Sequence, residues 1–101
     1  MSELVCQAEV KIKNADGLHM RPAMQFVDVA SGFKSKITII KNGLEVDGKS
    51  IMQVSMLAAT YGTILTIRAE GQDAAGAIEA IRELVEVKLF GEPPPAEGSV
   101  K

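Results

Sequence analysis

The stretch Gly17-Leu18-His19-Met20-Arg21-Pro22 holds the only histidine of the chain, three residues ahead of a proline. Proline has a fixed φ and no N–H, so a helix accepts it in its first turn and rejects it further along. Apolar residues follow at helical spacing, at Ala23, Phe26, Val27 and Ala30. The stretch therefore predicts a helix with His19 and Arg21 at its start and its end near Ser31-Gly32.

His19 and Arg21 are chemically suited to a phosphoryl group. The first N–H groups of a helix are unpaired and the helix dipole adds positive charge, so a helix start attracts anions such as phosphate. The same field disfavours an imidazolium, and a neutral imidazole is a nucleophile. Arg21 offers a planar fork of donors to phosphoryl oxygens. From the residues alone, the alternative is a solvated helix start without chemistry.

A family resemblance favours the chemical interpretation. Gly17-Leu18-His19-x-Arg21-Pro22-Ala23 resembles the phosphohistidine motif of HPr, the phosphocarrier family of the bacterial phosphoenolpyruvate-dependent sugar phosphotransferase system. Lys49-Ser50-Ile51-Met52 resembles the regulatory serine segment of the same family, and the similarity extends from about Cys6 to Gly91. It implies that His19 accepts phosphate on Nδ1 from Enzyme I and passes it to Enzyme II A components, with Arg21 stabilising it. The protein is then a covalent carrier, not a free-standing enzyme.

Ser50 has two possible roles, which can coexist. With Gln53 three residues later it forms the pattern of a capping box, which predicts a short helix through about residues 57–59. The resemblance implies a second role, because a dedicated HPr kinase/phosphorylase of some bacteria phosphorylates the matching serine and so lowers phosphate acceptance at the histidine.

Apolar residues and one lysine lie near the two predicted helix starts. Met20, Met24, Ile51 and Met52 fit either core filling or an interface. The resemblance implies that they form the docking patch for Enzyme I and the Enzyme II A components, where pliable methionines suit several partners. It also implies that Lys49 steers acidic partner surfaces.

Asp16 departs from the family pattern, which usually has a neutral polar or small residue there. A carboxylate close to a phosphoryl group is repelled by it. Asp16 also lies where a side chain could reach the first N–H groups of the helix. We interpret Asp16 as a helix cap rather than a part of the site.

The rest of the chain alternates short strand and helix patterns. Period-two alternation predicts strands at 4–12, 33–41, 44–47 and 63–70, with Asn42-Gly43 as a tight hairpin turn. Asp73 is expected to cap a last amphipathic helix that ends at Gly91. This order indicates an α+β fold with helices on one face of a mainly antiparallel sheet. A ferredoxin-like topology gives the same order, and the resemblance selects the HPr-like open-faced β-sandwich, four strands under three helices (β-α-β-β-α-β-α).

Composition limits the domain organisation and the function classes. The 101 residues, 47% hydrophobic, suit one domain at 1–91, followed by a Pro-rich tail at 92–101 that we expect to be disordered and to which we assign no function. A net charge of −2 with dispersed basic residues argues against nucleic acid, and no apolar run is long enough for membrane insertion. Cys6 is alone, so we expect a buried small hydrophobe, no disulfide and no metal or cofactor site. A cytoplasmic monomer is expected.

Two other functions compete with the carrier. One is a regulator that acts mainly through Ser50 or in nitrogen-related signalling, and the other is an unrelated small α+β binding module. The intact His19 argues against a purely regulatory relative, because one such branch of the family lacks that histidine. An RNA-binding sheet would need exposed aromatic and basic residues, and Phe26, Phe33, Tyr61 and Phe90 are too few and scattered.

Overall fold

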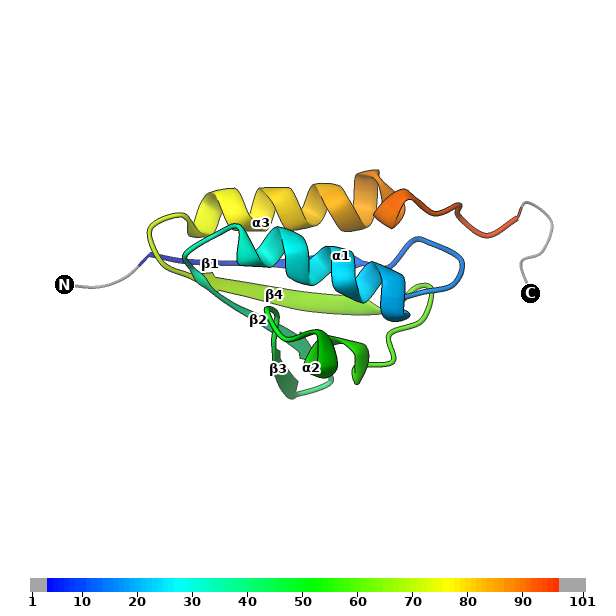
Figure 1. Cartoon of the computed structure of the whole chain (residues 1–101), viewed down its shortest axis with the longest axis horizontal. Coiled ribbons are helices and arrows are strands. Elements are labelled where there is room, and N and C mark those ends of the chain that lie inside the picture. The colour runs from blue at the N-terminus through cyan, green and yellow to red at the C-terminus, as the bar shows by residue number, and fades with distance from the viewer. Residues whose placement is uncertain (1–3, 97–101) are drawn as a thin grey trace.

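The computed structural model describes residues 4–96, and its strands and helices follow the predicted order (Figure 1). The elements are β1 (Val5–Lys11), α1 (Met20–Ser31), β2 (Lys36–Lys41), β3 (Leu44–Asp47), α2 (Ile51–Ser55), β4 (Ile64–Glu70) and α3 (Ala74–Arg82). A π-helical turn, η1 (Glu83–Val87), and a 3₁₀ turn, η2 (Leu89–Gly91), continue from α3. No helix among the described residues is long and apolar enough to span a membrane.

The strands form one sheet in the order β1-β4-β2-β3, and every neighbouring pair is antiparallel. The helices lie on one side of it (Figure 1). This is the open-faced α+β sandwich that was predicted. The hairpin between β2 and β3 turns at Asn42 and Gly43, whose φ values of 52° and 83° are those of a tight primed turn.

The core lies between the helices and the sheet. The apolar face of α1 is buried at Pro22, Ala23, Phe26, Val27 and Ala30. Leu65, Ile67 and Ala69 of β4 are fully buried, whereas the alternating side chains of the strand are partly exposed. Burial of this face fixes α1, and with it the position of its first turn, against the sheet.

Three details differ from the sequence prediction. β2 begins at Lys36 rather than Phe33, and α2 ends at Ser55, before the predicted residues 57–59. Cys6 is only partly buried because β1 is an edge strand, although its side chain packs against the core. The strand and helix patterns thus located the elements, while their ends depended on contacts elsewhere in the fold.

Asp73 precedes α3 but does not cap it, contrary to the prediction. Its carboxylate accepts the backbone N–H groups of Lys34 and Ser35, at 2.8 and 2.9 Å, and the Ser35 hydroxyl. These hydrogen bonds, the one from the Ser35 hydroxyl first, hold the pKa of Asp73 below its ordinary value of 3.8. Asp73 therefore ties the segment before β2 to the start of α3.

The last helix does not continue as an α-helix to Gly91. It is α-helical to Arg82, widens into η1, and turns sharply through Leu89 and Phe90, whose φ values are 51° and 56°. Phe90 is buried, and its carbonyl accepts a hydrogen bond from Nε2 of Gln25 in α1 at 3.0 Å. Gly91, with a φ of 74°, completes the turn, and the next residue, Glu92, lies close to the start of α1.

Candidate functional site

The loop before α1 is fixed by close backbone packing. Gly17 has a φ of +73°, and a Cβ there would lie 2.6 Å from the carbonyl oxygen of Ala59. The next N–H, of Leu18, donates to that same oxygen at 2.7 Å, and the Leu18 side chain is buried. Glycine is thus needed at position 17 for both its conformation and its lack of a side chain. His19 follows directly and begins the helix.

His19 is the N-cap residue of α1, and its side chain makes no cap hydrogen bond. Its carbonyl accepts the first helical bond, from the N–H of Ala23, at 2.9 Å. The N–H groups of Met20 and Arg21 have no acceptor within the helix, as at any helix start, and Pro22 has no N–H. Asp16 does not cap the helix, so that prediction was wrong. The start of α1 is left open to an anion.

Arg21 is exposed in the first turn of α1. Among residues 4–96, its guanidinium has no hydrogen-bond or ion-pair partner. Within this part of the chain, the guanidinium N–H donors that were predicted to bind a phosphoryl group are therefore not paired with another protein group.

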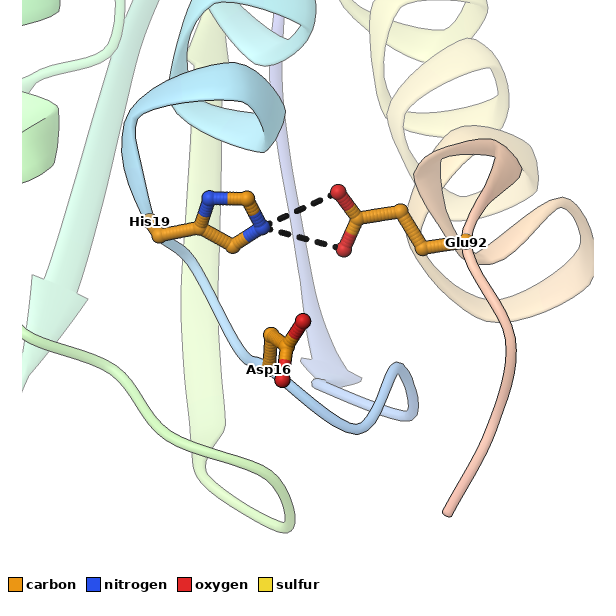
Figure 2. A group of neighbouring side chains, drawn as sticks. All are labelled: Asp16, His19 and Glu92. Carbon is orange, nitrogen blue, oxygen red and sulfur yellow. Dashed lines mark hydrogen bonds and ion pairs between the residues drawn. The ribbon is translucent and has the colours of Figure 1, made fainter. Parts of the chain in front are cut away.

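The imidazole of His19 contacts Glu92, which no feature of the sequence indicated. Its Nε2 lies 2.9 Å from Oε2 and 3.1 Å from Oε1 of Glu92 (Figure 2). The histidine side chain is 43% exposed and the glutamate side chain 10%. Nδ1, the other ring nitrogen, has no hydrogen-bond partner within residues 4–96. The first residue of the predicted tail, to which the sequence assigned no function, thus contacts the candidate site.

Asp16 also lies near this pair, although it was interpreted as a cap. Asp16, His19 and Glu92 each have one possible metal-ligand atom, and these three atoms lie within 4.8 Å of one another. Figure 2 shows the three side chains together. Imidazole nitrogen and carboxylate oxygens are donors that Zn²⁺ accepts, so these residues could hold a divalent cation. In this structure Nε2 of His19 and the carboxylate of Glu92 are paired directly with each other.

Ser50 caps α2, as predicted. Its Oγ accepts the backbone N–H of Gln53 at 3.2 Å. The other half of the predicted capping box is absent, because Oε1 of Gln53 accepts the N–H of Asp47 at 2.9 Å instead. Gln53 therefore links α2 to the end of β3, and the start of this helix is closed by its own neighbours.

The predicted docking residues are exposed on α1 and α2, two helices that pack against each other. Met20, Met24, Ile51 and Met52 all belong to this exposed apolar group. Met56, 69% exposed directly after α2, extends the group; the sequence prediction missed it, although its spacing of four residues from Met52 could have indicated it. Nζ of Lys49 donates to the carbonyl of Phe33 at 2.7 Å, so this lysine is anchored to the fold.

Comparison with known proteins assigns the chain to a family. Residues 6–87 match the family model described as the PTS HPr component phosphorylation site. The chain belongs to the HPr family. Phosphocarrier protein HPr of Haemophilus influenzae is 44% identical over 77 residues, which are 76% of this chain and 91% of that protein. HPr of Buchnera aphidicola is 47% identical over 73 residues, 72% of this chain and 86% of the relative. HPr proteins are phosphocarriers of the phosphotransferase system, as the motifs had indicated.

Solved HPr structures confirm the fold. HPr-C-His from Thermoanaerobacter tengcongensis has a TM-score of 0.82 at 41% identity, covering 86% of this chain and 97% of that one. Crh, the Bacillus subtilis catabolite repression HPr, has a TM-score of 0.60 at 38% identity, covering 79% and 95%. The open-faced sandwich is therefore common to a phosphocarrier and to a relative named for catabolite repression, and function must be argued from the site.

Proposed function

We propose that His19 accepts a phosphoryl group from phosphorylated Enzyme I and passes it to Enzyme II A components of the phosphotransferase system. The observation that carries the proposal is the state of the His19 ring: Nε2 is bonded to Glu92, whereas Nδ1 has no partner among the described residues. A ring nitrogen with a free electron pair is the nucleophile that such a transfer requires. Nδ1 is therefore the proposed phosphorylated atom.

The surroundings of His19 support the proposal. The first-turn N–H groups of α1 provide donors and positive dipole for an incoming phosphoryl group. Arg21 adds an exposed guanidinium in the same turn. Asp16 works in the opposite direction, because its carboxylate repels phosphate, and these positive groups offset that repulsion.

The partners are proposed to dock on the exposed apolar group of α1 and α2 around His19. Methionines at Met20, Met24 and Met52 can adapt to surfaces of different shape. Lys49 adds positive charge at the edge of α2 for an acidic partner. Phosphorylation of Ser50 by an HPr kinase/phosphorylase would put a charged group at this edge and regulate the transfer.

The test is to incubate the full chain with phosphoenolpyruvate and Enzyme I and to measure its intact mass. We expect a gain of one phosphoryl group that is lost in acid, because a phosphoramidate is acid-labile, and that moves to an added Enzyme II A. A sample without Enzyme I is the control and should gain no mass. No gain of mass in the complete mixture, or a gain that survives acid, would overturn the proposal.

A further inference from the structure

We propose that Glu92 is a positioning residue for phosphoryl transfer: it holds the proton of His19 on Nε2 and so leaves Nδ1 as the nucleophile. This inference rests on the function proposed above and assigns a role to a residue beyond the HPr-family match, which ends at residue 87. Both carboxylate oxygens of Glu92 face the same ring nitrogen, at 2.9 and 3.1 Å (Figure 2).

The Glu92 carboxylate is itself held in place by a buried side chain. Nδ2 of Asn14 donates to Oε1 of Glu92 at 2.9 Å and to the carbonyl of Gly17 at 2.8 Å. Asn14 is fully buried, and the N–H of the next residue, Ala15, donates to the carbonyl of Pro93 at 3.0 Å. The loop that leads to His19 therefore binds both the side chain of Glu92 and the backbone after it.

This geometry selects one form of the imidazole. A carboxylate has only acceptor atoms, so its bond to Nε2 requires a hydrogen on that nitrogen. The neutral ring has a single N–H, and therefore Nδ1 must carry the free electron pair. The carboxylate thus orients the ring and fixes its tautomer, as the acidic residue does in a Ser-His-Asp triad.

The same contact stabilises the product of transfer. When the electron pair of Nδ1 attacks phosphorus, a bond from Nδ1 to phosphorus forms and the bond to the donor breaks, with its electrons leaving on the donor. The ring then carries phosphate on Nδ1, a proton on Nε2 and a positive charge, which the Glu92 carboxylate faces. When phosphate passes to the acceptor, the bonding electrons return to Nδ1 and the proton stays on Nε2.

Asp16 does not take this role, although it lies in the same group of side chains. Its carboxylate makes no hydrogen bond to His19 or Glu92 among the contacts of the described residues, and it is exposed. Glu92 is mostly buried and is bonded to both His19 and Asn14. Removing the charge of Glu92 should therefore affect the ring of His19 more than removing that of Asp16.

The test compares Glu92→Gln with the parent and with Glu79→Gln, which removes the same charge from an exposed position of α3. In ¹⁵N NMR spectra the ring nitrogens of His19 should show the Nε2–H tautomer in the parent and in Glu79→Gln. In Glu92→Gln we expect a mixture of both tautomers with an otherwise unchanged backbone spectrum. With Enzyme I, kcat for Glu92→Gln should fall about tenfold while KM stays near the parent value, as for loss of a charge-assisted bond in the transition state.

The outcomes separate this inference from the proposed function. If the parent is phosphorylated and Glu92→Gln matches it in tautomer and in kcat, the role of Glu92 is overturned and the carrier function stands. If the parent is not phosphorylated, the carrier function fails, and the NMR measurement still shows whether Glu92 fixes the tautomer of the His19 imidazole. Loss of kcat in Glu79→Gln equal to that in Glu92→Gln would also overturn the positioning role, because net charge alone would then explain it.

Discussion

Helices α1 and α2 begin in opposite ways. At α2 the hydroxyl of Ser50 accepts the N–H of Gln53, so the helix is capped by its own residue. At α1 the N-cap residue His19 makes no such bond, and its ring is turned to Glu92 instead. A side-chain cap stabilises a helix but occupies a donor that an anion could use. The start of α2 is thus closed by a side-chain cap, whereas α1 has no such cap, which agrees with the phosphate binding that we propose there.

Apart from loss of His19 itself, the largest effect on transfer should follow removal of Arg21, because its exposed guanidinium is proposed to bind the phosphoryl group. Arg21→Ala should slow transfer from Enzyme I roughly ten- to a hundredfold, the loss of a charge-assisted hydrogen bond. The melting temperature should change little, since Arg21 has no partner within residues 4–96. Rapid-quench transfer rates and thermal melts are the measurements.

Arg21→Lys is the matched control, because it keeps the charge and removes the planar fork. Its transfer rate should lie between those of the parent and Arg21→Ala. A large loss of melting temperature with normal transfer in Arg21→Ala would mean that the start of α1 is built for stability after all.

A smaller effect is expected at the start of α2. Ser50→Asp should reduce the rate at which Enzyme I phosphorylates His19 by several-fold, because it puts a charge beside the exposed side chains of Ile51 and Met52. Its thermal stability should stay near that of the parent, since aspartate also caps helices. Ser50→Ala should do the reverse: it keeps the transfer rate and loses about 1 kcal/mol of stability. Equal transfer rates for the parent, Ser50→Asp and enzymatically phosphorylated protein would leave Ser50 as a helix cap only.

The smallest effect concerns a third helix start, where Asp73 binds the segment before β2 instead of its own helix. Its pKa is lowered in the folded protein, mainly by the Ser35 hydroxyl, so its stabilising effect is complete above about pH 3.8 and is lost as the pH falls below that value. Asp73→Asn should therefore be less stable than the parent at neutral pH, and the difference should shrink in acid. Urea unfolding at a series of pH values measures this. A difference that stays constant below pH 3.8 would contradict it.

The parts of the fold that follow from neighbouring residues were predicted correctly. Pro22 in the first turn, the Asn42-Gly43 hairpin and the Ser50 cap each depend on local conformation. The family match at residues 6–87 also agrees with the motifs around His19 and Ser50. Local chemistry and motif spacing were therefore enough for the element order and the position of His19, whereas the topology came from the family resemblance.

The predictions that failed are those that contacts outside the local motif could change. Asp16, Gln53 and Asp73 were all expected to cap helices by sequence position, and the last two bind backbone groups of other elements instead. Glu92 is 73 residues from His19, in a Pro-rich stretch without an apolar period. A turn with positive φ values at Leu89, Phe90 and Gly91 brings it back to α1, and no residue pattern indicates such a conformation at the two non-glycine positions. Residues 97–101 of the predicted tail lie outside the described residues, and the division at 91/92 stays a prediction.

The most direct test of the central claim treats the two helix starts side by side. The parent, His19→Ala and Ser50→Ala are each incubated with phosphoenolpyruvate and Enzyme I, and intact mass is measured before and after acid. We expect one acid-labile phosphoryl group on the parent and on Ser50→Ala, and none on His19→Ala, whose backbone NMR spectrum should still show the native fold. Acid-labile labelling of His19→Ala, or its loss in Ser50→Ala, would contradict the account.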